Sequence, residues 1–181
     1  MRRLFVACAT LLACTACTAP VDTAITASAT TTSANAAVAY TQLNSSDYQS
    51  FVKNWTPEED AFCGAFGSVA DWSAVMHPAA TMGSHTYAPP DSLWAGHAVL
   101  MLARVAPSGD AVHVFQVNAV RRTQDGIEVD YTFTSPPPAS STEKYYFAIS
   151  VAKPLAGRIR FITNGHDACD AELGAAHTGP G

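Results

Sequence analysis

The sequence has few charged residues, few cysteines and little basic charge. Charged side chains make up 14% of the 181 residues, and ten Lys and Arg against fifteen Asp and Glu give a net charge of -5. This balance argues against binding to nucleic acid, whose phosphates attract cationic surfaces. Because 48% of the residues are hydrophobic, the composition also argues against a wholly disordered chain. At this length we expect one folded domain with extensions.

The sequence contains no recognisable catalytic, metal-binding or phosphate-binding motif. It has neither a His-x-His spacing, nor a His-Glu-x-x-His motif, nor two Cys-x-x-Cys pairs. No Gly-x-Ser-x-Gly turn and no glycine-rich phosphate loop occur either. Residues 166–170 bring candidate ligands together, but an ordinary polar segment is the simpler interpretation. We therefore expect no catalytic residues, no metal and no cofactor. The six histidines are His77, His85, His97, His113, His166 and His177.

The start of the chain resembles the signal peptide of a bacterial lipoprotein. Arg2 and Arg3 precede an apolar run over residues 4–13, which has the length of a signal-peptide core and is too short to cross a bilayer. The run leads into Leu-Leu-Ala-Cys-Thr-Ala-Cys, where small residues precede a cysteine that such proteins carry lipidated. Cys14 has the better preceding pattern, with a leucine three residues earlier. Cys17 gives the more usual length and removes two cysteines with the signal peptide.

These observations predict a lipoprotein signal peptide over residues 1–16, with Cys17 as the lipidated residue and Cys14 as the alternative. The chain is then expected in the cell envelope, anchored in a membrane and facing the periplasm or the exterior. In a host with an outer membrane, the Thr that follows either cysteine, where retained lipoproteins usually carry Asp, implies the outer membrane. A secreted protein without a lipid, cut after a small residue, is the competing interpretation.

Residues 17–46 are rich in Thr, Ala and Ser and carry almost no charge. Such a composition cannot bury enough apolar surface to fold, so we predict a flexible tether with a reach on the order of 30 Å. A first strand or helix over residues 36–43 is the alternative. A single domain over residues 47–173 and a disordered tail over residues 174–181 complete the predicted organisation.

The domain is predicted to contain one short helix. Ser68, followed three residues later by Asp71, indicates a capped helix from Val69 to about Met76. Pro78 prevents its continuation, because proline lacks the backbone N–H that a helix needs. Residues 91–96 are compatible with either a turn of helix or a loop.

Several strands are predicted after the helix. A near-continuous apolar run over residues 97–105 predicts a central strand covered on both faces. The Asp-Gly pair at residues 125–126 favours a tight turn between strands over residues 112–121 and 127–133, with a bulge near Phe115, where the alternation slips. Two further strands are predicted over residues 144–152 and 158–162. The predicted fold class is α+β, a small antiparallel, twisted or barrel-like β-sheet with one short helix.

Cys63 and Cys169 are the cysteines of the predicted domain and lie far apart in the chain. In an oxidising compartment, two such thiols are best explained as a disulfide. In the chain-entropy model, a bridge that closes a loop of about a hundred residues stabilises a domain by about 4 to 5 kcal/mol. A catalytic cysteine paired with a histidine such as His166 is the alternative, and it lacks any local motif.

The domain also has an order of segments that is typical of one family. The segments are SVADWSAVM as a capped helix with Trp72, AVLMLARV, the turn at SGD, the strand pair around QDG, the proline break, EKYYFAISVAKP and RIRF, over about residues 62–163. This order resembles the C-terminal-like domain of the protease-complex subunit PrcB of bacterial envelope proteins. Residues 145–154 stand in place of that family's PY…VP strand, and residues 108–111 in place of its glycine-rich turn. The resemblance implies a small binding domain associated with envelope protein complexes, without catalytic residues.

The strand over residues 144–152 is a candidate binding edge. Tyr146, Ala148 and Ser150 alternate with its core positions, so we expect them to face away from the core. A strand beside a proline break is a candidate sheet edge that can add a partner strand through its backbone. The alternative is that a neighbouring strand or the tether covers it.

We therefore expect a lipid-anchored, non-enzymatic module that binds another envelope protein or a peptide, for example as an accessory subunit of an envelope complex. Two competing hypotheses belong to other functional classes. One is a periplasmic enzyme that uses histidine and aspartate side chains, with His97, His113 and His166 as its candidate residues. The other is a small-ligand carrier, which requires an enclosed apolar cavity within the sheet.

Overall fold

The computed structural model describes residues 35–43, 50–52, 61–78, 86–109 and 114–173, which belong to one compact unit over residues 32–181. The predicted signal peptide, most of the predicted tether and the predicted tail lie outside these residues. So do Cys14, Cys17, His85, His113 and His177. Neither of the helices within the described ranges is long and apolar enough to cross a membrane.

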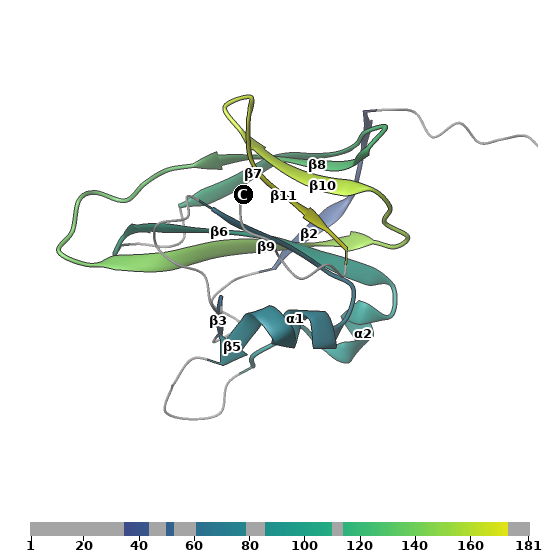
Figure 1. Ribbon diagram of the computed structural model, residues 1–181, viewed down its shortest axis with the longest axis horizontal. Coiled ribbons are helices and arrows are strands. Elements are labelled where there is room, and N and C mark those ends of the chain that lie inside the picture. The colour runs from purple at the N-terminus through teal and green to yellow at the C-terminus, as the bar shows by residue number, and fades with distance from the viewer. Residues whose placement is uncertain (1–34, 44–49, 53–60, 79–85, 110–113, 174–181) are drawn as a thin grey trace, which may run out of the picture. The chain divides into compact units, whose positions relative to one another are not determined.

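The described residues form three layers (Figure 1). The first layer is a five-stranded sheet with the order β1 (Ala36–Ala37), β7 (Phe115–Arg122), β8 (Gly126–Phe133), β10 (Arg158–Thr163) and β11 (His166–Glu172). The second is a four-stranded sheet with the order β2 (Tyr40–Leu43), β9 (Thr142–Ala152), β6 (His97–Pro107) and β4 (Phe62–Phe66). The third contains α1 (Val69–Val75), α2 (Asp91–Trp94) and the two-stranded sheet of β3 (Ser50–Val52) and β5 (Met76–Pro78).

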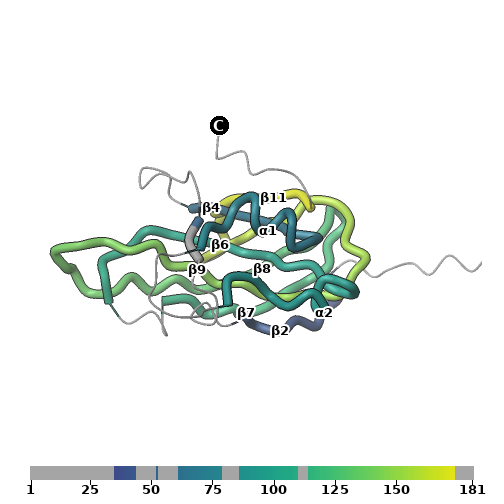
Figure 2. The backbone as a smooth tube through the Cα atoms, turned by 90° about the horizontal axis from the view of Figure 1, so that it is seen from below, coloured from purple at the N-terminus to yellow at the C-terminus, as the bar shows by residue number. Residues whose placement is uncertain are grey.

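Two apolar cores hold the layers together. One lies between the two larger sheets and includes Leu100, Phe147 and Phe161. The other lies between the four-stranded sheet and the helices, and includes Trp72 and Trp94. Figure 2 shows α1 and α2 lying across this sheet. Strands β6 and β9 contribute side chains to both cores, which confirms the predicted central strand that begins at His97.

One side of the two-sheet sandwich is closed by the chain itself. β1 is an edge of the five-stranded sheet and β2 an edge of the four-stranded sheet, and only Val38 and Ala39 separate them. Val38 donates its N–H to the Val120 carbonyl at 2.8 Å, beside β7. Residues 36–43 therefore correct the predicted tether, because they form strands, as the alternative prediction had it. The composition of residues 36–43 does not predict strands. These strands form because two sheet edges, made by residues later in the chain, supply their hydrogen-bond partners.

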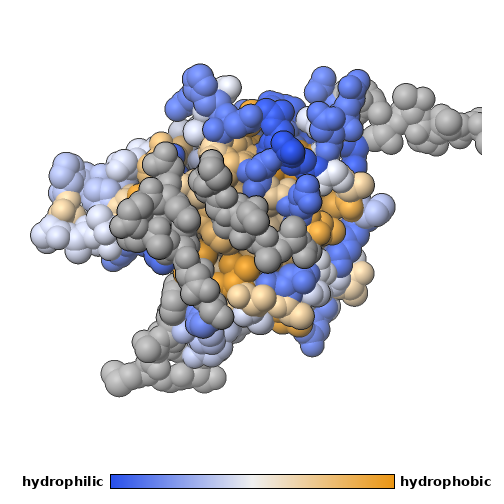
Figure 3. Space-filling view, viewed as in Figure 1, coloured by the Kyte–Doolittle hydropathy of each residue, from blue (hydrophilic) through white to orange (hydrophobic). Residues whose placement is uncertain are grey.

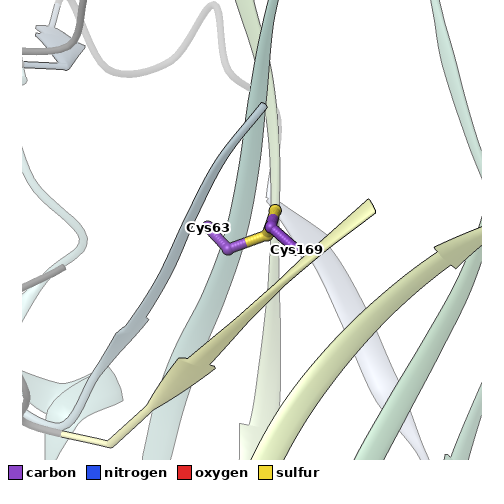
Figure 4. The surroundings of a disulfide bond; sticks show 2 residues. All are labelled: Cys63 and Cys169. Atoms are coloured by element: carbon purple, nitrogen blue, oxygen red, sulfur yellow. A yellow bond between two sulfur atoms is a disulfide. The ribbon is translucent and has the colours of Figure 1, made fainter. Parts of the chain in front are cut away.

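The opposite side is closed by a disulfide between Cys63 of β4 and Cys169 of β11 (Figure 4). These strands are the other two edges of the sandwich, and the bridged Cα atoms are 6.0 Å apart. The predicted pairing is thereby confirmed. The bridge joins two sheet edges that belong to different hydrogen-bonded ladders.

The prediction of a purely antiparallel sheet is wrong at one pairing. β10 runs parallel to β8, with Ile159 opposite Ile127 and Phe161 opposite Val129. The reason is that β9, which lies between them in the chain, belongs to the other sheet, so the chain returns beside β8 in the same direction. The described strands form three separate sheets, and neither of the two larger ones closes into a barrel.

The prediction of one short helix is also incomplete, because the described residues contain two. α1 begins as predicted, and the Ser68 hydroxyl accepts a hydrogen bond from the Asp71 N–H at 3.2 Å. α2 is the segment that the sequence left open between helix and loop. It forms where Pro90 precedes the first helical residue and Trp94 packs into the second core.

The predicted hairpin forms between β7 and β8, but its bulge lies elsewhere. The register shifts between Val117 and Ala119, and not near Phe115. Phe115 and Val120 are both buried although they are five residues apart. An extra residue between them restores the alternation, which is the usual role of a bulge.

Candidate functional site

A groove runs beside the edge strand β2, and we call it the β2–α2 groove. It has a volume of about 370 Å³. Strand β2 forms one wall, α2 with the residue before it forms the other, and β9 and β6 supply the remaining surface. Its lining residues are Thr41, Leu43, Pro90, Ser92, Leu93, His97 and Ser150. The described lining mixes apolar side chains with hydroxyls and one imidazole, and among these described residues there is neither a carboxylate nor a Lys or Arg side chain.

The polar part of the groove centres on Ser150, which is a buried polar residue in the otherwise apolar middle of β9. Its hydroxyl lies 3.5 Å from the Thr41 carbonyl of β2. Ser150 and Thr41 are directly opposite each other in the antiparallel pair, so both side chains project toward the same face. A hydroxyl pair thus lies beside the apolar side chains of Leu43 and Leu93.

Three side chains outside the groove hold its α2 wall in place. The Trp94 indole donates its N–H to the Pro89 carbonyl at 3.1 Å, and the Trp72 indole donates to the Tyr87 carbonyl at 3.0 Å. The Lys153 ammonium donates to the Trp94 carbonyl at 2.8 Å and to the Gly67 carbonyl at 2.7 Å. Because these bonds fix both ends of α2, the groove is formed without a ligand.

The backbone of β2 presents hydrogen-bonding groups away from its own sheet. In the β6–β9 ladder the Lys153 N–H bonds the Gly96 carbonyl directly opposite it. Antiparallel ladders alternate between bonded and non-bonded pairs, so Ser150 of β9 directs its backbone groups toward β2. Thr41 meets these groups. The neighbouring residues Tyr40 and Gln42 therefore point their N–H and C=O groups outward.

No strand of the described residues pairs with this outward edge of β2. Tyr40 is 37% exposed, and its hydroxyl donates to the Val117 carbonyl of the other sheet at 3.4 Å. This contact ties the exposed ring to β7. The edge of β2 thus presents the outward N–H and C=O groups of Tyr40 and Gln42, together with the Tyr40 ring, whose hydroxyl is bonded to β7.

The other edges of the two sheets are protected in ways that β2 is not. β1 has only two residues, and all five residues of β4 are buried. β11 carries Asp167, Asp170 and Glu172, and charge is a common device against strand addition. β2 reads Tyr-Thr-Gln-Leu and has no charged residue. It is the edge where a further strand meets the least opposition.

The outer face of the five-stranded sheet is polar (Figure 3) but electrically balanced. Arg121 lies 3.4 Å from Glu128, Glu128 lies 3.9 Å from Arg160, and Arg160 lies 2.6 Å from Asp167. The hydrogen bond with Asp167 raises the pKa of Arg160 above its usual value. Each of these arginines has a carboxylate partner, so the face does not present a free cationic patch for an anion.

A second depression of about 240 Å³ lies over β10 and β11 on the same sheet. Arg158 and Arg160 line it together with Asp167 and Asp170. Arg158 lies 3.1 Å from Asp170, so both arginines of this depression are paired as well. Its charges are satisfied within the depression itself, and we regard the β2–α2 groove as the better candidate site.

The structure describes two of the three predicted histidines, and it does not bring these two together. His97 begins β6 and lines the β2–α2 groove, whereas His166 begins β11 in the other sheet, opposite Thr163. His113 lies outside the described residues. Within the described ranges, no three side chains of His, Cys, Asp or Glu are grouped so that they could hold a metal ion.

The predicted binding edge on β9 is also corrected. Tyr146, Ala148 and Ser150 point away from the core between the larger sheets, but Ala148 and Ser150 are buried, and Ala148 and Tyr146 pack into the second core beneath the helices. β9 is an interior strand between β6 and β2. The strand that covers it comes from the predicted tether, which was the stated alternative. The edge of this sheet is therefore β2, one strand further out than predicted, and strand addition itself stays a prediction.

A scan against models of known protein families, a search of curated proteins and a search of solved structures found no match to this chain. The resemblance to the PrcB C-terminal-like domain therefore stays a prediction. The functional argument rests on the groove and on the edge of β2.

Proposed function

We propose that this chain is a lipid-anchored, non-enzymatic module of the cell envelope that binds an extended protein segment by strand addition at β2. The observation that carries the proposal is the outward direction of the Tyr40 and Gln42 backbone groups along an uncharged edge. Backbone bonds of this kind give affinity in strand addition, and adjacent pockets give selectivity. The β2–α2 groove lies on the same face as Thr41 and Leu43 and is suited to receive side chains of the added strand.

The anchor and the location are supported by the sequence at residues 1–17, which has the features of a lipoprotein signal. In this proposal Cys17 carries the lipid and the chain up to β1 spaces the domain from the membrane. Mass spectrometry of the mature N-terminal peptide is expected to show an acylated cysteine. Cys17→Ala is expected to abolish acylation and Cys14→Ala to leave it intact. Acylation that survives Cys17→Ala but not Cys14→Ala would move the anchor to Cys14.

The binding proposal is tested with a photo-reactive amino acid at Ser92, an exposed residue on the α2 wall of the groove. Irradiation of intact envelopes is expected to give a defined protein adduct. The matched control places the same group at Gln116, which is exposed on the five-stranded sheet. An adduct that forms equally from both positions would count against the site.

Gln42→Pro makes the test specific for strand addition. Proline removes the outward N–H of residue 42 and leaves the inward bonds of Thr41 and Leu43 to β9 in place. The adduct from Ser92 is therefore expected to disappear with Gln42→Pro and to persist with Gln42→Ala, which keeps the N–H. Circular dichroism checks that both variants are folded. A folded Gln42→Pro variant that still forms the adduct would exclude pairing at this edge.

A further inference from the structure

The edge of β2 has the backbone register of a strand that can pair with a copy of itself. Tyr40 and Gln42 point their backbone groups outward, and Thr41 between them points its groups inward. In an antiparallel pair with a two-fold axis, the residue on the axis faces its own copy, either as a hydrogen-bonded pair or as a non-bonded pair. With Thr41 on the axis, Thr41 forms a non-bonded pair, and its outward-pointing neighbours Tyr40 and Gln42 both fall in hydrogen-bonded pairs.

We infer that β2 pairs with β2 of a second copy of this chain, antiparallel and with Thr41 on the two-fold axis. This inference rests on the proposed function, because it names the strand that β2 binds. In this register Tyr40 lies opposite Gln42 of the second copy, and Gln42 opposite Tyr40. Each of these two pairs exchanges two hydrogen bonds, so all four outward groups on each copy are satisfied. The two four-stranded sheets become one continuous sheet.

Side chains at the junction agree with this register. The two Thr41 side chains meet as a non-bonded pair, where neighbouring side chains are closest and threonine pairs are favourable. β2 carries no charge, so the strand does not repel its own copy. The same symmetric pairing at β11 would bring the Asp167, Asp170 and Glu172 carboxylates of two copies together. The exposed Tyr40 ring, held at Val117, would lie directly opposite the Gln42 amide.

The groove adds a second argument for a self-pairing partner. Among the residues that the structure describes, its lining holds no carboxylate and no Lys or Arg side chain, so this part of the lining offers no charge that would select a foreign segment. A strand of four residues buries less area than a standard interface, so pairing in dilute solution is expected to be weak. Two copies anchored in one membrane reach a much higher effective concentration. We therefore expect the pairing when the protein is anchored in a membrane, and the test is made on the membrane-anchored protein.

The test is cysteine crosslinking of the full chain in native membranes. In the inferred register the two Thr41 Cα atoms lie about 4.5 Å apart, which is within reach of a disulfide. The two Gln42 Cα atoms lie about 8 to 9 Å apart, because they are offset by two residues, and they cannot be bridged. Both positions are exposed, and the two variants carry the same number of cysteines. Thr41→Cys is expected to give at least about tenfold more crosslinked dimer under mild oxidation than Gln42→Cys.

Adding Gln42→Pro to the Thr41→Cys variant is expected to abolish the dimer, since it removes two of the bonds between copies. Equal crosslinking from Thr41→Cys and Gln42→Cys would overturn the inference, because random collision does not distinguish the register. Absence of a Thr41→Cys dimer would overturn it as well. If the Ser92 adduct then still forms with another protein and still depends on the residue 42 N–H, the proposed function stands and its partner is a different chain. If that adduct is also lost, both proposals fail.

Discussion

Lys153 connects both helices to the four-stranded sheet through its side chain and its backbone. Its ammonium donates to the carbonyls of Gly67, just before α1, and of Trp94, at the end of α2. Its backbone N–H bonds Gly96 in the β6–β9 ladder. The residue therefore fixes the helices to the sheet and shapes the β2–α2 groove, although no motif in the sequence indicates such a role.

Lys153→Met keeps the aliphatic stem and removes both ammonium hydrogen bonds. Bonds to charged groups contribute about 1.5 to 3 kcal/mol each at most, and the side chain is partly solvated, so we expect a loss of about 1 to 3 kcal/mol in the free energy of unfolding. Urea denaturation followed by tryptophan fluorescence measures it. The matched control is Arg158→Met, because the Arg158–Asp170 pair is exposed and should be worth less than about 1 kcal/mol. Equal losses for the two variants would contradict this role of Lys153.

Tyr131 carries the buried polar side-chain atom that lacks a hydrogen-bond partner among the described residues. Burial raises the pKa of its hydroxyl above the usual value of 10.0, and the nearby Arg104 guanidinium opposes this only in part. We expect Tyr131→Phe to be neutral or to stabilise the fold by up to about 1 kcal/mol, because it removes an unsatisfied group. Tyr145→Phe is the control. The Tyr145 hydroxyl bonds the turn at residues 107–109, so its loss should cost about 1 to 2 kcal/mol.

The raised pKa of Tyr131 also predicts a pH dependence. Above about pH 10 an unfolded tyrosine loses its proton, whereas the folded form retains it because its pKa is raised. The folded state then binds more protons than the unfolded state, so the free energy of unfolding falls as pH rises through this range. Tyr131→Phe is expected to reduce this alkaline loss. Urea midpoints at neutral and alkaline pH test it, and an unchanged slope in the variant would refute the assignment.

At the scale of elements, the parallel pairing of β8 and β10 depends on a glycine. Gly126 begins β8 with a φ of +151°, and a Cβ atom there would overlap the backbone of Arg158. Gly126→Ala is therefore expected to cost more than about 2 kcal/mol. Gly96→Ala is the matched control, because a Cβ there meets nothing within 4 Å. It should change the stability by less than about 1 kcal/mol. Thermal unfolding of both variants provides the comparison.

The elements that could be predicted from the sequence are those whose signals are local. The capped start of α1 at Ser68, the turn before Gly126 and the apolar run from His97 each depend on residues within a few positions of one another. The sequence of β11 predicts only a polar segment, since its alternation of acidic and small residues gives little burial of its own. It becomes a strand because β10 and the Cys63–Cys169 bridge hold it.

The candidate site could not be predicted because its parts are distant in the chain. β2 forms only where β9 offers an edge more than a hundred residues later, and the residue pair Thr41 and Ser150 has no local signature. The walls of the groove come from residues 41–43 and 90–93. The residues around β2 are rich in Thr, Ala and Ser, a composition that predicts a flexible tether and not a strand. Strand addition stays a prediction, and it could be made from the sequence because it depends on an exposed edge and not on particular side chains.

At the scale of the whole molecule, the sandwich is closed on one side by the β1–β2 crossing and on the other by the disulfide. Replacing both Cys63 and Cys169 with Ser removes a bridge that spans 106 residues, and the chain-entropy model gives a loss of about 4 to 5 kcal/mol. We expect β11 to lose protection from hydrogen exchange first, because it is a sheet edge. Native protein treated with reductant is the control and should match the double variant. A loss below about 1 kcal/mol would mean that the unfolded chain is already constrained.

The same two closures give the domain an uneven response to mechanical load. A pull between the chain ends acts first on β1 and β2, which are short and lie N-terminal to the bridge. While the disulfide is intact, the loop from Cys63 to Cys169 adds no length to the extended chain. Reduction would release roughly 370 Å of contour length over the sequence separation of 106 between the two cysteines, at about 3.5 Å per residue. Tension from the N-terminal side would thus peel β2, and any strand bound to it, from β9 before the bridged core yields.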